Sequence, residues 1–161
     1  MKTLALAFGL MVAAISAQAQ SLVLGAGYSD FSDARGRDTA TLSLEYQFAP
    51  FYSGRVIEIS TLIAADHDGE GDSYAGVGLG AKWRLKNDWF IEASTMPGYY
   101  NAGTAANDLG GHFHFRSLLG VGRTLPSGNA VSMALTHKSN ASTKSYNPGV
   151  NALLVRYHLA F

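Results

Sequence analysis

The chain of 161 residues contains no cysteine, so disulfide frameworks and thiolate metal sites are excluded. Charge is also sparse: Asp, Glu, Lys and Arg make up 15% of the residues, with 12 basic against 12 acidic side chains. A protein that binds nucleic acid through its phosphates needs an excess of basic residues. The sequence therefore predicts no nucleic acid partner.

Long apolar runs are absent except at the N-terminus. Residues 3–16 are almost wholly apolar and follow Lys2, and residues 17–19 read Ala-Gln-Ala, the form of a signal-peptidase site. The run of roughly 14 residues is shorter than the ~20 that a membrane-spanning helix needs. We predict a cleaved signal peptide over residues 1–19 and a single domain over residues 20–161.

A sustained helical period is missing from the rest of the chain, which instead alternates between apolar and polar residues. Turn signals such as Asn147–Pro148–Gly149 separate the alternating segments. We predict eight strands, near residues 21–30, 39–48, 55–65, 74–85, 88–99, 110–123, 129–138 and 150–161.

The alternation favours an all-β fold, an eight-stranded antiparallel transmembrane β-barrel of the bacterial outer membrane. Strands of about 10 residues with one apolar and one polar face fit such a barrel. Trp83 and Trp89 lie near strand ends, as in an interfacial aromatic girdle, and the last strand alternates up to a terminal Phe161, as in outer-membrane proteins. A soluble β-sandwich has the same period and is the competing architecture.

The polar segment between the last two predicted strands carries candidate catalytic residues. His137 and Ser139 are a base and a nucleophile two positions apart, and Asn140 and Asn151 carry amide groups. Side chains alternate faces along a strand, and the apolar residues on either side place His137, Ser139 and Asn151 on the lipid-facing side. The parity therefore predicts a site that meets a lipid.

Topology predicts the depth of this site. With an even number of strands both termini lie in the periplasm, so the seventh strand ends, and the eighth begins, at the extracellular rim. We expect the site at the boundary between headgroups and acyl chains of the outer leaflet. An ester that joins a fatty acid to a sugar lies at that level, which makes the lipid A of lipopolysaccharide the expected substrate.

The segment His-x-Ser-Asn-Ala, followed by Asn-Pro-Gly-x-Asn and an alternating last strand, resembles the PagL family of lipid A 3-O-deacylases. The resemblance implies a carboxylic ester hydrolase that releases a 3-hydroxy fatty acid from position 3 of the proximal glucosamine. By motif position, His137 matches the base, Ser139 the nucleophile and Asn140 the residue proposed for the oxyanion hole. We expect this chemistry to need no cofactor.

One position departs from the family pattern, because Asn151 stands where the best-known members carry a glutamate. Asparagine can orient an imidazole but cannot supply negative charge, and a triad Asp→Asn change costs about 10⁴ in rate in one well-studied enzyme. The strand carboxylates Glu45, Glu58 and Glu92 are expected to point inward, so none is an evident substitute.

Several alternatives stay open. The chain could be an inactive deacylase, a structural or adhesive barrel, or another lipid acyl hydrolase or acyltransferase that uses the same serine. His112 and His114 are expected in an interior polar network rather than a metal site, and residues 66–72 in a solvated loop rather than a cation site. A homodimer that shields part of the lipid-facing wall is also open.

Overall fold

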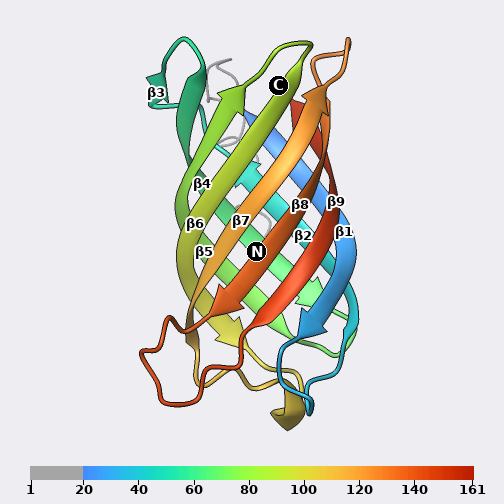
Figure 1. The fold of residues 1–161 in the computed structure, drawn as a ribbon, viewed down its shortest axis with the longest axis vertical. Helices are drawn as coiled ribbons and strands as arrows, with labels where there is room; N and C mark the ends of the chain where they lie inside the picture. Colours follow the sequence, from blue (N-terminus) through green and yellow to red (C-terminus); the bar gives the residue numbers. More distant parts are fainter. Residues whose placement is uncertain (1–19) are drawn as a thin grey trace, which may run out of the picture.

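The computed structural model describes residues 20–161, and the predicted signal peptide lies outside the described residues. The described chain forms a closed antiparallel barrel of eight strands (Figure 1), which confirms the predicted fold class. Each long strand pairs with its neighbours, and the β1–β9 and β2–β4 pairings close the barrel. The elements are β1 (Ser21–Phe31), β2 (Thr39–Gln47), β3 (Tyr52–Ser53), β4 (Ile57–Asp68), β5 (Ser73–Arg84), β6 (Trp89–Asn101), η1 (Ala105–Asn107), β7 (Phe113–Thr124), β8 (Ala130–Ser139) and β9 (Val150–Ala160).

The two ends of the barrel differ. Ser21 and Ala160 are register partners, so β1 begins where β9 ends, and we call this the terminal end. The opposite end, the loop end, carries the β1–β2 loop (residues 32–38), the β6–β7 loop (residues 102–112) and the β8–β9 loop (residues 140–149). The loop end lies at the bottom of Figure 1.

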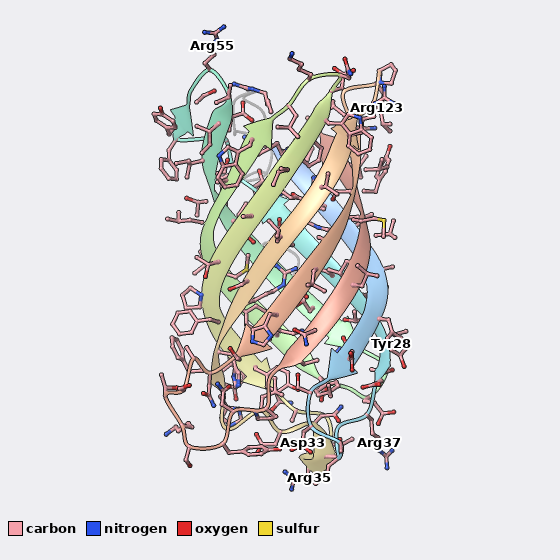
Figure 2. All side chains as sticks on the ribbon, in the orientation of Figure 1. Tyr28, Asp33, Arg35, Arg37, Arg55 and Arg123 are labelled. Atoms are coloured by element: carbon pink, nitrogen blue, oxygen red, sulfur yellow. The ribbon has the colours of Figure 1, made fainter. Side chains whose placement is uncertain are left out.

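The outer wall is apolar, as the alternation predicts. Tyr28 projects from this wall near the loop end (Figure 2), while tryptophans are exposed near the terminal end. Large exposed apolar side chains of the wall include Leu24, Leu42, Leu44, Ile63, Val77, Leu79, Leu119, Val121, Met133, Leu135, Leu153 and Val155. A wall of this kind is suited to the hydrocarbon interior of a bilayer.

Buried ion pairs occupy part of the interior, beside a cluster of buried apolar side chains. Arg116 lies 3.3 Å from Glu45 and 3.1 Å from Asp66. Arg156 lies 2.7 Å from Glu45 and 2.8 Å from Glu92. Buried charges persist when they are paired in this way, and the paired side chains occupy the narrow lumen of an eight-stranded barrel.

The structure departs from the predictions at three places. Residues 66–68 belong to β4, and Asp66 and Asp72 are buried, so the expectation of a solvated loop over residues 66–72 is wrong. The short strand β3 pairs with β4 and was not predicted. β7 begins at Phe113, and His112 lies outside the strand with its ring stacked on Tyr99 at 4.9 Å. The expectation of an interior His112 is therefore wrong, whereas His114 is buried and contacts the Leu109 carbonyl.

Within residues 20–161, no helix is long and apolar enough to cross a membrane. No group of three or more histidine or acidic side chains in the same residues is arranged to hold a metal ion.

Candidate active site

His137 and Asn151 form the centre of the candidate site. They are direct register partners on β8 and β9, two residues from the loop end of β8. His137 Nδ1 lies 2.9 Å from Asn151 Oδ1. An amide oxygen can only accept, so in this pair Nδ1 donates its proton and Nε2 keeps the lone pair that a general base needs. The structure thus brings together two of the predicted site residues.

Gly149 packs against the imidazole from the β8–β9 loop. Its φ of +72° lies in the left-handed region that favours glycine. A Cβ at this position would stand 2.9 Å from His137 Cε1 and 3.5 Å from Nε2. The sequence predicted only a turn at Asn147–Pro148–Gly149, whereas the structure shows that the glycine also makes room for the ring of His137.

Ser139 is the last residue of β8 and lies on the same outward face as His137. It is half-buried and opposite Phe115 on β7. Within residues 20–161 its hydroxyl makes no hydrogen bond to the imidazole. Residues two apart on a strand are separated by roughly 6.6 Å along it, and such contacts often tighten only when substrate binds.

Asn140 occupies a place that the sequence did not indicate. It is fully buried, and its Nδ2 donates to the carbonyl oxygens of Leu109 (3.1 Å), Gly110 (3.2 Å) and Tyr146 (2.8 Å). Its backbone N–H donates to Asn147 Oδ1 at 2.9 Å. Asn140 therefore ties the β8–β9 loop to the β6–β7 loop. Its predicted role as an oxyanion donor stays a prediction, and it requires the exchange of one of these bonds.

The backbone after Asn140 turns sharply. Ala141 and Ser142 both have positive φ, at 52° and 61°, and Thr143 closes the turn with bonds from its N–H and hydroxyl to the Asn140 carbonyl. Non-glycine residues in this conformation are strained and are found at functional sites. The Ala141 and Ser142 amides have no hydrogen-bond acceptor within residues 20–161, so both remain able to donate.

Tyr146 connects the β8–β9 loop to the β1–β2 loop. Its hydroxyl donates to Asp33 Oδ2 at 2.5 Å and accepts from Arg35 Nη2 at 2.7 Å, and Arg35 also pairs with Asp33 at 2.9 Å. We call Asp33, Arg35 and Tyr146 the loop clasp; Figure 2 shows Asp33 and Arg35 together at the loop end. Hydrogen bonds from Arg35 and Tyr146 hold the pKa of Asp33 below its usual value, and the bond to Asp33 raises the pKa of Tyr146.

A second hydroxyl lies beside the histidine. Ser117 on β7 is the register partner of His137 and is exposed on the same outer face. Sequence reasoning missed it because alternation gives the face of a residue but not its neighbour on the next strand. Ser117 is therefore the natural control for any test of Ser139.

Solved structures share this barrel. The chain is similar to the structure described as the outer membrane enzyme PagL, with 18% identity, a TM-score of 0.67, and coverage of 86% of this chain and 98% of that one. It is also similar to Neisserial surface protein A, with 10% identity, a TM-score of 0.59, and coverage of 88% and 97%. The attachment invasion locus protein Ail of Yersinia pestis gives 10% identity, a TM-score of 0.58, and coverage of 91% and 100%.

A family model also matches most of the chain. The model described as "Lipid A 3-O-deacylase (PagL)" matches residues 37–160, which include His137, Ser139, Asn140 and Asn151. No curated protein matches the chain significantly.

Proposed function

The chain belongs to the PagL family of lipid A 3-O-deacylases, outer-membrane proteins, and from that premise we propose that it is a serine esterase. In this proposal it acts at the outer leaflet and hydrolyses the ester of the 3-hydroxyacyl chain at position 3 of lipid A. The observation that carries the proposal is the bond from His137 Nδ1 to Asn151 Oδ1, which leaves Nε2 as the base.

The reaction follows from these groups. The Ser139 oxygen attacks the ester carbonyl carbon while His137 Nε2 takes the serine proton. The tetrahedral intermediate collapses, the bond to the sugar oxygen breaks, and the imidazolium returns the proton to the leaving alkoxide. Water then attacks the acyl-enzyme with His137 again as base, which releases the 3-hydroxy fatty acid and restores Ser139.

The surroundings of the site support an amphiphilic substrate. Leu135 and Leu153, the next outward residues toward the middle of the barrel wall, are register partners and are about half exposed. An acyl chain can lie along them while the sugar stays at the level of the loops. This part of the wall faces lipid, so a soluble substrate would not contact it.

The backbone supplies candidate donors for the oxyanion. The unpaired amides of Ala141 and Ser142 follow the nucleophile by two and three residues. Donors of this kind that are fixed in place before reaction stabilise the developing charge. We assign these amides to the oxyanion hole, and Asn140 joins them only by exchanging one of the bonds through which its side chain holds the turn in place.

Covalent labelling tests the serine mechanism directly. We expect a lipophilic phosphonate probe to modify Ser139, as shown by peptide mass spectrometry. The label should persist in Ser117→Ala, disappear in Ser139→Ala and fall strongly in His137→Ala. Modification of Ser117 instead, or deacylation of lipid A that survives in Ser139→Ala, would remove Ser139 as the nucleophile. An inactive or purely adhesive barrel would carry no label at all.

A further inference from the structure

A row of four polar side chains crosses the outer wall at the loop end. The row runs across four neighbouring strands, and each member is the register partner of the next. Its members are Ser117 on β7, His137 on β8, Asn151 on β9 and Asp30 on β1. The first three belong to the site described above. The fourth, Asp30, is a carboxylate at the end of the row.

Asp30 faces the same side as Asn151. It is exposed between the buried residues Ser29 and Phe31, while Asn151 lies between the buried residues Val150 and Ala152. Residues directly opposed on antiparallel strands have Cβ atoms about 4.5–5.5 Å apart. This separation is within reach of a hydrogen bond between a short amide and a short carboxylate.

The bonding of Asn151 leaves its amide nitrogen available to Asp30. Asn151 Oδ1 accepts from His137 Nδ1, and Nδ2, which carries two N–H donors, has no acceptor within residues 20–161. The Asp30 carboxylate likewise has no ion-pair partner in the described part of the chain. The Asn151 amide nitrogen, which lacks an acceptor in the described chain, therefore lies opposite the Asp30 carboxylate, which lacks an ion-pair partner there.

Asp30 is also the one carboxylate on the outer faces of β1, β7, β8 and β9 as described. Arg123, the other charged side chain on these faces, lies at the terminal end (Figure 2). Lys138 and Arg116 point inward, where they pair with Asp66. Of the charged side chains on these faces, Asp30 is thus the one at the loop end, where His137 lies.

We propose that Asp30 is a positioning residue that gives His137 the negative charge which Asn151 cannot supply. The proposal rests on the proposed function. Asn151 Nδ2 donates to the Asp30 carboxylate, and Asn151 Oδ1 accepts from His137 Nδ1–H. The carboxylate polarises the amide and stabilises the imidazolium that forms when Ser139 loses its proton, and no proton moves to Asp30. At a membrane boundary the low dielectric lets a charge act over this distance.

Glu45, Glu58 and Glu92, which the alternation places inward, do not replace the family's glutamate, and this proposal assigns the missing charge to Asp30 instead. Glu45 and Glu92 are buried in ion pairs, and Glu58 pairs with Arg84 near the terminal end, as their inward assignment requires. The sequence alone does not pair Asp30 with Asn151, because the two lie some 120 residues apart in the chain. Only the closure of the barrel by β1 and β9 brings the two together.

The test compares Asp30→Asn in two backgrounds. In the natural chain, we expect Asp30→Asn to lower kcat for lipid A deacylation about tenfold or more, with KM little changed. The loss should be smaller than the ~10⁴-fold lost when a directly bonded triad carboxylate is replaced. In an Asn151→Glu background, where the histidine has its own carboxylate, the same change should cost little. Loss of the charge should also move the acidic limb of the pH profile to lower pH, because the imidazolium is less stabilised.

Controls separate this effect from others. Glu70→Gln removes a carboxylate at the same end of the barrel outside the row and should leave kcat unchanged. Folding is checked by gel mobility with and without heating, and Asp30→Ser replaces Asp30→Asn if the latter does not fold. If kcat and the pH profile of Asp30→Asn equal those of the natural chain, or if the loss is the same in both backgrounds, the proposal is overturned. Activity that depends on Ser139 would still uphold the proposed function in that case.

Discussion

At the scale of single residues, the proposed chemistry depends on how the imidazole of His137 is held. Asn151 fixes the Nδ1 side of His137 through a 2.9 Å bond, and Gly149 lies against its Cε1 edge. Because Nδ1 is bound to Asn151, Nε2 lies on the side of the ring away from Asn151. In the proposed mechanism the position of the imidazole therefore depends on Gly149 as well as on Asn151.

We predict that Gly149→Ala folds but loses most of its activity. The added Cβ would stand 2.9 Å from the imidazole, so the ring must shift, and a displacement of about 1 Å in a catalytic group can cost about 10²-fold. The measurement is the rate of lipid A deacylation. Gly128→Ala is the matched control, since Gly128 has a φ of +87° but nothing within 4 Å of its Cβ position. If both variants lose the same deacylation activity, the cause is backbone strain and not contact with the imidazole.

At the scale of elements, the β8–β9 loop supplies several residues that position the candidate site. It carries Asn140, Asn147 and Gly149, and it is tied to the β6–β7 loop by Asn140 and to the β1–β2 loop by Tyr146.

Because the pKa of Asp33 lies below its usual value, the clasp is lost only when pH falls through that lowered value. The raised pKa of Tyr146 extends the clasp past the usual tyrosine value of 10.0 on the alkaline side. Both shifts favour the ionised Asp33 and the protonated Tyr146, which are the forms that make the clasp.

We predict that Tyr146→Phe loosens this loop without unfolding the barrel. The change removes the hydroxyl that joins Asp33 and Arg35 to the loop. Trypsin should then cleave faster after Lys144, and kcat should fall by roughly twofold to tenfold because the loop that positions Gly149 is less fixed. Cleavage after Lys86, in a turn at the terminal end, serves as the internal reference. An unchanged rate after Lys144 would show that Asn140 alone secures the loop.

The elements themselves could be predicted well from the sequence. Each long strand was expected, and the largest differences are three residues, at Asp68 against 65 and at Phe113 against 110. The period of two also gave the outward face of His137 and Asn151, because alternation is local information. Register is not local, so the neighbours Ser117 and Asp30 could not be predicted from the alternation. The buried role of Asn140 depends on a loop 30 residues away and left no signal in the sequence.

At the scale of the whole molecule, two opposite environments decide where the substrate can be. The described interior holds the ion pairs of Arg116 and Arg156 with buried carboxylates. The outer wall is apolar up to Leu135 and Leu153 and becomes polar at His137 and Asn151. This boundary matches an ester between an acyl chain and a sugar, which supports the proposal that lipid A is the substrate.

The central claim is that this barrel removes an acyl chain from lipid A through Ser139. The most direct measurement is mass spectrometry of lipid A from outer membranes that contain the natural chain, Ser139→Ala, Ser117→Ala or no added protein. We predict that the natural chain and Ser117→Ala remove one 3-hydroxyacyl chain, while Ser139→Ala inserts normally and leaves lipid A intact. Lipid A of unchanged mass in the presence of the correctly inserted natural chain would contradict the claim.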